Sequence, residues 1–405
     1  MVKLVSVSRQ SGESASSSDG EKSTEISTSR VLENWLFAYN QYTAESESPE
    51  QFHLWTGLSV LSSALKRNVW VNQGIYLLFP NMFVILVGPP GKVAKSTTIR
   101  LGRKLLLGLE DIIFGPDSVT REELIRVMSK AGLNRTQSAL TIHSTEMSSL
   151  IEPSGIKMIQ FLTDIYDGDF KWQHSTKHSG RDIIENPVLN ILAGTTPSWI
   201  AEGLPSDVLG HGFTARVIFV YGSEPRYLMP FPREPNSELV KDLINDLDHI
   251  SRIEGAFTWG DGSRDLYSDM YTKLASSIPD DYRIEGFHNR KKVHLLKVAM
   301  ILSISENDEL VLRKVDLETA WDILNLVEKD MGKTFSAVGK YDHANDLERI
   351  LLRIRKEGGM TAESIHKEFY AMGDIQEIGK ILLMLMQMGS IKRKDESGTT
   401  WYRPA

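Results

Sequence analysis

A run of six apolar residues, Met82–Val87, leads directly into a turn rich in glycine and proline, and this junction strongly constrains the fold. Continuous apolar runs of this kind are typical of parallel strands that are buried on both faces of a sheet. The turn ends at Lys95, and an amphipathic helix is predicted from Ser96 to Leu109. A strand, a glycine-rich turn and a helix in this order predict a phosphate site, because N–H groups of the turn and the helix N-terminus point toward an anion.

Two residues at the end of this turn, a lysine and a serine, have different expected roles. We assign Lys95 to the outer phosphates of a nucleotide and Ser96 to its Mg²⁺ ion. The common form of such a loop has a glycine before the lysine, whereas here Ala94 precedes it and the turn is one residue longer. Lys92 is the alternative lysine, but Val93 follows it and offers no hydroxyl to Mg²⁺, so Lys95 is preferred. The predicted ATP-binding residues are Gly88, Pro89, Pro90, Gly91, Lys92, Val93, Ala94, Lys95, Ser96 and Thr97.

Residues 81–235 alternate between apolar runs and amphipathic stretches, which predicts an α/β core with a mainly parallel sheet. The expected strands are Phe83–Val87, Ala139–His143, Val188–Ala193 and Val217–Tyr221. The expected helices between them are Ser96–Leu109, Thr120–Ala131 and Gly155–Tyr166. Residues 222–235 contain four prolines, which indicates a linker or a surface crossing at the end of this core.

The regions on either side of this core differ from it in pattern. Residues 1–28 are rich in Ser, Glu, Gly and Thr and are expected to form a disordered leader. Residues 29–80 predict a helical N-terminal collar, with helices at Val31–Tyr42 and Glu50–Arg67 and short strands at Val69–Asn72 and Tyr76–Phe79. Residues 236–338 predict an almost wholly helical lid. Residues 344–405 predict three helices and two strands, the pattern of a winged helix, which serves in DNA binding or in protein contacts.

Composition and charge exclude several classes of protein. The chain of 405 residues has no cysteine, which excludes disulfides, thiolate metal sites and cysteine nucleophiles and favours a reducing cytosol. No stretch approaches the ~18 apolar residues of a membrane span, and the N-terminus has no signal-peptide core. The net charge of −7 argues against a protein that coats nucleic acid, although it allows positive charge to be concentrated in a channel.

The stretch from Gly88 to Ser96 resembles the phosphate loop of the minichromosome maintenance (MCM) helicases, with one residue inserted and the same Ala-Lys-Ser ending. The longer pattern from about residue 49 to 330 resembles the phage and plasmid primase–helicase ATPases that are related to them. This resemblance implies a P-loop NTPase core of the AAA+ type that binds ATP and Mg²⁺. It also implies a homo-oligomeric ring, expected to be a hexamer, that holds DNA with a hairpin before its sensor 1 strand.

The resemblance also implies a catalytic carboxylate. Glu146 follows the strand Ala139–His143, which in a P-loop ATPase lies beside the phosphate loop, so its carboxylate would polarise the attacking water. These ATPases normally have an aspartate just before this glutamate to hold the magnesium shell, and here Thr145 stands in that position. Hydrolysis is therefore expected to be slow unless Asp164 or Asp167 contributes.

Three further roles follow from the same resemblance. Thr195 or Thr196 would contact the γ-phosphate and the attacking water as sensor 1, with Thr196 preferred. Arg216, just before the strand Val217–Tyr221, would act as an arginine finger in the neighbouring subunit's ATP site, because a guanidinium makes forked contacts with phosphate oxygens. The sensor 2 candidates, among which the sequence does not choose, are Arg290, Lys292 and Lys297.

Residues 170–184 predict a β-hairpin immediately before the sensor 1 strand, where the related helicases have their pore hairpin. Lys177, His178 and Arg181 cluster at its tip and are the predicted DNA-binding residues. Six such hairpins around a ring would form a positive channel that follows a phosphate backbone without reading its sequence. An exposed surface ribbon is the alternative interpretation.

These predictions favour an ATP-dependent, ring-forming DNA helicase or translocase of phage-type DNA replication. Its expected partners are single-stranded or forked DNA and further copies of the chain, with a primase or polymerase as a candidate partner. The expected location is the cytoplasm of a bacterium or of a phage-infected cell. The alternative is a replication initiator or loader that binds ATP and DNA but hydrolyses ATP weakly, which Thr145 favours.

Overall fold

The computed structural model describes residues 29–168, 170–176, 180–204, 208, 212–279, 281–335, 341–369, 375–396 and 399–404. Contacts divide the chain into two compact units. The first ends at Thr334 and omits Ile200–Glu202, which group with the second unit from Phe335 onward. The leader predicted at residues 1–28 lies outside the described residues. None of the described helices is both long and apolar enough to cross a membrane.

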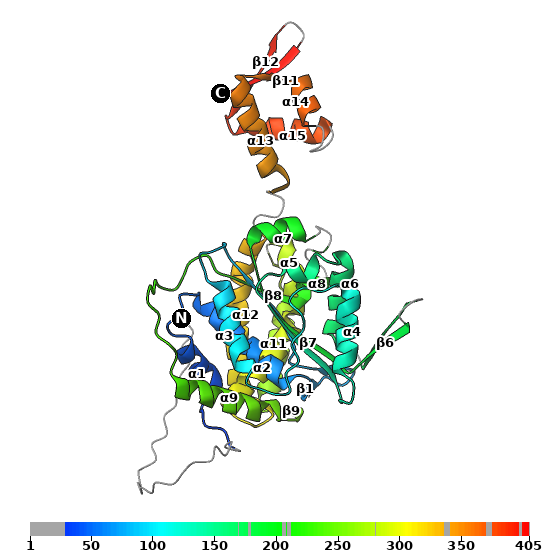
Figure 1. Ribbon diagram of the computed structural model, residues 1–405, viewed down its shortest axis with the longest axis vertical. Helices are drawn as coiled ribbons and strands as arrows, with labels where there is room; N and C mark the ends of the chain where they lie inside the picture. Colours follow the sequence, from blue (N-terminus) through cyan, green and yellow to red (C-terminus); the bar gives the residue numbers. More distant parts are fainter. Residues whose placement is uncertain are drawn as a thin grey trace. The chain divides into compact units, whose positions relative to one another are not determined.

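The first unit is built around a parallel sheet of four strands, which confirms the predicted α/β class. The strands are β3 (Phe83–Val87), β4 (Ser138–Ser144), β7 (Pro187–Thr195) and β8 (Val217–Tyr221). Their order is β4-β7-β3-β8, and every neighbouring pair is parallel. All residues of β3 and β7 are buried, because helices cover both faces of the sheet (Figure 1). This double burial explains why β3 is a continuous apolar run and why β7 is mainly apolar in the sequence.

Five of the helices in this unit had predicted positions, and their observed ends lie within four residues of the predicted ends. The helices of the unit are α1 (Trp35–Tyr42), α2 (Glu50–Leu65), α3 (Lys95–Leu106), α4 (Arg121–Ala131), α5 (Ser148–Ile151), α6 (Ile156–Tyr166), α7 (Pro197–Gly203), α8 (Gly212–Arg216), α9 (Ser237–Ser251), α10 (Ser263–Ala275), α11 (Glu285–Glu306) and α12 (Lys314–Thr334). The first helix was expected from Val31 but begins four residues later. Asn34 ends the extended segment, because its side chain accepts a hydrogen bond from the Phe37 N–H at 2.9 Å and caps the helix.

A second sheet lies outside the core sheet and corrects the prediction of an almost wholly helical lid. Its order is β10-β9-β1-β2, formed by β10 (Val311–Leu312), β9 (Gly255–Trp259), β1 (Val69–Asn72) and β2 (Leu77–Leu78). β9 pairs in parallel with β1, so the lid region supplies a strand to the collar region. The sequence did not reveal β9 because only Phe257 of its five residues is buried, which gives no clear apolar pattern.

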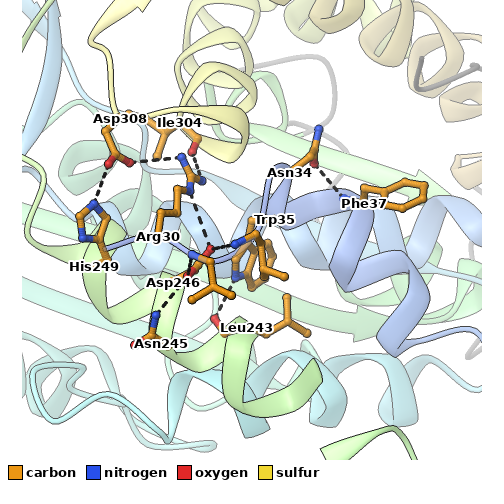
Figure 2. Close-up of polar contacts among 12 residues, drawn as sticks. Arg30, Asn34, Trp35, Phe37, Leu243, Asn245, Asp246, His249, Ile304 and Asp308 are labelled. Atoms are coloured by element: carbon orange, nitrogen blue, oxygen red, sulfur yellow. Dashed lines mark hydrogen bonds and ion pairs between the residues drawn. The ribbon is translucent and has the colours of Figure 1, made fainter. Parts of the chain in front are cut away.

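A buried carboxylate anchors the first described residues to the helices of this unit (Figure 2). Asp246 in α9 accepts hydrogen bonds from the backbone N–H groups of Val31 and Leu32, each at 2.8 Å, and its side chain is fully buried. Arg30 reaches α11, where it donates to the carbonyl oxygen of Ile304 at 2.6 Å, and it also pairs with Asp308 at 3.2 Å. The segment before α1 is therefore fixed by its backbone and does not join the helix.

The described residues of the second unit form three helices and a three-stranded antiparallel sheet. Its elements are α13 (Tyr341–Glu357), β11 (Met360–Thr361), α14 (Ala362–Glu368), α15 (Ile375–Gln387), β12 (Ile391–Glu396) and β13 (Thr399–Pro404). The sheet order is β11-β13-β12, so β11 adds one strand to the two that were predicted. Thr361 caps α14, since its hydroxyl accepts a hydrogen bond from the Ser364 N–H at 3.1 Å. One apolar core, which includes Ile354, Ile381 and Leu385, joins the three helices.

Candidate nucleotide site

The glycine-rich turn follows β3 at the carboxyl edge of the core sheet. Gly88 donates its N–H to the carbonyl oxygen of Thr195 at 3.3 Å, which ties the start of the turn to the end of β7. A Cβ atom added to Gly88 would lie 2.2 Å from the carbonyl oxygen of Gly222, so only glycine fits at this position. Gly222 in turn donates to the carbonyl of Val87 at 2.9 Å. Backbone contacts from both neighbouring strands thus hold the turn in place.

Lys95 is the first residue of α3, and its side chain folds back over the turn. Its Nζ atom donates hydrogen bonds to the carbonyl oxygens of Gly88 at 2.7 Å and Pro89 at 3.2 Å. The lysine is almost completely buried, and this burial lowers its pKa, while the negative charge of Glu146 raises it. The ammonium group therefore lies inside the loop and within electrostatic reach of the predicted catalytic carboxylate.

Ala94 adopts the left-handed conformation that glycine usually supplies. Its φ and ψ angles are 44° and 39°, and it is the N-cap residue of α3. A residue with a Cβ atom is disfavoured there by about 1–2 kcal/mol. The loop thus keeps a glycine-like backbone at the position where the common pattern has glycine, although the sequence has alanine. Ser96, the predicted magnesium residue, follows as the second residue of the helix.

The predicted carboxylate lies at the same edge of the sheet, but not on the strand next to β3. β7 lies between β3 and β4, so the expectation that Glu146 follows a strand beside the phosphate loop is wrong in this detail. Gly194, near the end of β7, allows the chain before Glu146 to lie close to Lys95. A Cβ atom on Gly194 would lie 2.7 Å from the carbonyl oxygen of Thr145 and 3.6 Å from Cβ of Lys95. The chain before Glu146 and the base of Lys95 therefore both pack against this one glycine.

The two sensor 1 candidates differ in what their hydroxyls contact. Thr196, the preferred candidate, hydrogen-bonds to the Ser198 hydroxyl at 2.9 Å and accepts the Trp199 N–H at 3.2 Å, so it caps the start of α7. Thr195 is buried beside Val87, and no partner among the described residues lies within hydrogen-bonding distance of its hydroxyl. Buried hydroxyls are normally paired. Thr195 therefore has a free hydrogen-bonding group at the edge that carries Lys95, whereas Thr196 does not.

A cavity of about 290 Å³ adjoins the same loop and was not expected from the sequence. Ala94, Thr97 and Leu101 form one wall, and residues 42–47 and 229–235 form the others. The segment of 222–235 that we predicted as a linker thus forms part of the cavity. Arg226 holds it there by donating from Nε to the carbonyl oxygen of Ser46 at 2.7 Å. In the sequence, Arg226 stands out only as a basic residue within a proline-rich stretch, and nothing there identifies its distant partner.

Arg216 lies at the amino ends of the parallel strands, opposite the carboxyl ends where the turn is found. Val217, the next residue, pairs with Phe83 at the start of β3, whereas the phosphate loop follows the end of β3, a strand length of about 16 Å away. Arg216 donates from Nε to Asp167 at 3.2 Å and from a terminal nitrogen to the carbonyl of Gly212 at 2.7 Å. Asp167, considered above as a magnesium residue, is thus at the wrong edge to assist Lys95 of its own chain.

The sensor 2 candidates also separate by their contacts. Lys297 is buried and donates to the backbone and side-chain oxygens of Asn81 at 2.8 and 2.7 Å, and burial lowers its pKa strongly. Lys292 contacts the Tyr271 hydroxyl at 3.2 Å. Arg290 pairs with Asp167, beside Arg216. Of the three, only Arg290 forms an ion pair with the carboxylate that also binds Arg216.

The predicted hairpin is present as β5 (Lys171–Thr176) and β6 (Gly180–Glu185), which pair in an antiparallel ladder. Lys177 and His178 lie outside the described residues. Arg181 is exposed and donates to the side chain of Gln173 on the facing strand. At the base, Trp172 packs edge-on against Phe161 of α6, with ring centres 5.0 Å apart. The hairpin is therefore rooted on the core and continues directly into β7.

Comparisons with known proteins give no family assignment: no protein-family model matches the sequence, and no curated protein matches it. Among the described residues, no group of three or more His, Asp or Glu side chains is arranged to hold a metal ion.

Proposed function

We propose that this protein is a ring-forming, ATP-hydrolysing DNA translocase whose first unit is a P-loop NTPase core of the AAA+ type. One observation carries the proposal: Lys95, the chain just before Glu146 and the Thr195 hydroxyl lie together at the carboxyl ends of the parallel strands. This hydroxyl has no partner among the described residues. The turn beside them begins with Gly88, where no side chain fits. Arg216 lies at the amino ends of the strands, a strand length away from the phosphate loop of its own chain. This position supports a site that is completed by a second copy. The resemblance to the MCM-related helicases supplies the class of reaction.

The chemistry follows from these positions. N–H groups of the turn and of the α3 N-terminus would bind the phosphates, and Lys95 would exchange the carbonyls of Gly88 and Pro89 for phosphate oxygens. Bound Mg²⁺, held by the nucleotide and the Ser96 hydroxyl, would neutralise phosphate charge. Glu146 would orient a water molecule and accept its proton, and the Thr195 hydroxyl would donate toward the γ-phosphate. We thus move the sensor 1 role from Thr196 to Thr195.

The cavity beside α3 suits the nucleoside part of ATP. It is mainly apolar, it begins at Ala94 and Thr97 beside the phosphate loop, and its volume of about 290 Å³ is at the lower end of ligand pockets. The fixed segment 229–235 gives it a preformed wall. A purine ring in this cavity would place its phosphates at the N-terminus of α3.

The test compares two lysines of one loop. Lys95→Ala should reduce hydrolysis by about 10²-fold or more, because it removes a charge from the transition state. Lys92 belongs to the predicted loop through its backbone, whereas its side chain is half-exposed and pairs with Glu224 at the surface, so Lys92→Ala is the matched control. It should bind and hydrolyse ATP like the wild type. Equal loss in both variants, or none in either, would contradict the proposed register.

A second measurement tests the ring. Mixtures of Lys95→Ala and Arg216→Ala subunits should regain part of the activity that each variant alone lacks, because some interfaces then combine an intact loop with an intact arginine. No recovery in mixtures that co-assemble would exclude a shared site.

The second candidate function is an ATP-binding replication initiator or loader with weak hydrolysis, and Thr145 favours it because a hydroxyl holds a magnesium shell less firmly than a carboxylate. DNA-stimulated hydrolysis and strand separation on a forked duplex distinguish the two. ATP binding and DNA binding without turnover would support the initiator.

A further inference from the structure

Asp167 bridges two guanidinium groups that come from different parts of the chain. One carboxylate oxygen accepts hydrogen bonds from Arg216, at 3.2 Å from Nε and 2.5 Å from a terminal nitrogen, and the other oxygen accepts from Arg290. The arginine side chains are mostly buried, with 15% and 24% of their surface exposed, while the aspartate side chain is 43% exposed. The carboxylate is thus the part of this cluster that solvent, or another molecule, can reach.

The cluster has an excess of positive charge. The excess arises because one carboxylate, Asp167, faces the guanidinium groups of Arg216 and Arg290. Lys297 also lies here, but burial strongly lowers its pKa. His294 also lies here, but burial lowers its pKa to about 3 and keeps it neutral. The Nε atom of Arg290 is buried and has no partner among the described residues. An excess of charge and an unmet donor both favour an additional anion at this place.

The chain links Asp167 to the hairpin. Asp167 ends α6, and β5 begins four residues later at Lys171. Arg67 ties the two ends of the hairpin together, because it donates to the carbonyl oxygens of Gly168 at 2.5 Å and Pro187 at 3.2 Å. A displacement of the hairpin therefore acts on the residue next to Asp167.

We infer that Asp167 is an internal counter-ion that holds Arg216 and Arg290 together until a nucleotide phosphate of a second copy replaces it, and that nucleic acid bound to the hairpin promotes this exchange. The inference rests on the proposed function and adds a positioning residue that couples nucleic-acid binding to hydrolysis. A terminal phosphate carries more charge than one carboxylate and offers three acceptor oxygens, so it can satisfy both guanidinium groups at once. Before the exchange, Asp167 offsets part of the charge of the two arginines and keeps them turned toward their own chain.

The experiment measures ATP hydrolysis with and without a thymidine oligonucleotide. The wild type should be stimulated by the oligonucleotide. Asp167→Asn should raise the unstimulated kcat by about fivefold, the size expected for loss of one partly exposed ion pair, and should lower the stimulation ratio by the same factor. KM for ATP should stay nearly unchanged, because the phosphate loop of the neighbouring copy still binds the ground state, whereas the two guanidinium groups act mainly on the transition state.

The matched control is Asp308→Asn. Asp308 also bridges two basic side chains, Arg30 and His249, and its side chain is 44% exposed, yet it lies on neither the hairpin nor the arginine cluster. This variant should keep the wild-type kcat and stimulation ratio.

The outcomes separate the two proposals. A wild type without stimulated hydrolysis would overturn the proposed function and the inference together. A stimulated wild type with an unchanged ratio in Asp167→Asn, or with kcat lowered in both conditions, would overturn the inference alone. If Asp167→Asn does not fold, Asp167→Glu keeps the charge but displaces it by one methylene. It should then show a reduced ratio at a wild-type melting temperature, and an unchanged ratio would overturn the inference.

Discussion

The ammonium group of Lys95 lies 2.7 Å from the carbonyl oxygen of Gly88, so the loop itself holds the lysine that is expected to bind phosphate. Carbonyl oxygens are neutral acceptors, and hydrogen bonds from a cation to an anionic oxygen are stronger. A phosphate can therefore displace them with little rearrangement of the side chain. The lysine is positioned in advance, which reduces the entropy that binding would otherwise cost.

Ala94→Gly should stabilise the protein. The left-handed backbone at Ala94 disfavours a Cβ atom, and glycine removes this penalty at the cost of a more flexible unfolded chain. The net gain expected is up to about 1 kcal/mol, measured as an increase in the free energy of unfolding in urea. Ala94→Val should have the opposite effect, because a β-branched residue is more strongly disfavoured there. Destabilisation by glycine would show that the loop is not strained at this position.

Thr195→Val and Thr196→Val should have opposite profiles. Thr195→Val removes a buried hydroxyl that has no partner among the described residues, so stability should be equal or higher. ATP hydrolysis should fall by about 10²-fold if this hydroxyl contacts the transition state. Thr196→Val removes a helix cap and should cost about 1 kcal/mol with little effect on kcat. Urea denaturation and steady-state kinetics on both variants check this. A large kinetic loss in Thr196→Val alone would restore the original assignment.

Asp246→Ala should release the segment before α1. The substitution leaves the N–H groups of Val31 and Leu32 without their acceptor and should cost about 2–3 kcal/mol of unfolding free energy. Asp248→Ala, in the same helix, removes a surface pair with Arg252 and should cost less than about 1 kcal/mol. Limited proteolysis should also cut residues 29–34 faster in Asp246→Ala only. Similar losses in both variants would show that the anchor contributes little.

Stability should decrease in acid because of buried histidines. Burial lowers the pKa values of His53, His143 and His294 to about 3, below the unfolded value of about 6.5. The unfolded chain thus binds more protons below pH 6.5, so this contribution is complete above pH 6.5 and is lost as the pH falls toward 3. Each histidine adds a slope of up to about 1.4 kcal/mol per pH unit in that window.

His143→Phe isolates one of these contributions. Neither ring nitrogen of His143 has a partner among the described residues, so the substitution removes a titrating group without breaking a side-chain hydrogen bond. The melting temperature of the variant should fall less than that of the wild type between pH 7 and pH 5. An identical pH dependence would show that His143 does not titrate on unfolding.

The sequence was sufficient for elements whose pattern is local. β3 and β8 occur at the predicted residues, because strands buried on both faces need continuous apolar runs. The ends of α3 and α4 were predicted to within a few residues from their amphipathic repeats. Lys95 and Ser96 occur together at the start of α3, because both belong to one short segment, and their roles toward phosphate and magnesium stay predictions.

Features that depend on distant partners could not be predicted in the same way. Nothing near Asp167 indicates that Arg290 will reach it from α11, and nothing near Arg226 indicates that it will hold the carbonyl of Ser46. The choice between Thr195 and Thr196 also depended on the three-dimensional structure, because two adjacent hydroxyls differ only in the groups that surround them. In each of these cases the deciding contact joins residues that are far apart in the chain.

The parallel pairing of β1 with β9 has a consequence for the order in which the protein folds during synthesis. Val69 is made early, yet its partner Gly255 leaves the ribosome only after the whole core sheet has been translated. At about 5–20 residues per second, the collar strand waits roughly ten seconds or more with one edge unpaired. Unpaired strand edges are prone to association with other chains. The collar, although it comes first in the sequence, can complete its sheet only after the core, and newly made chains are most exposed to misassembly in that interval.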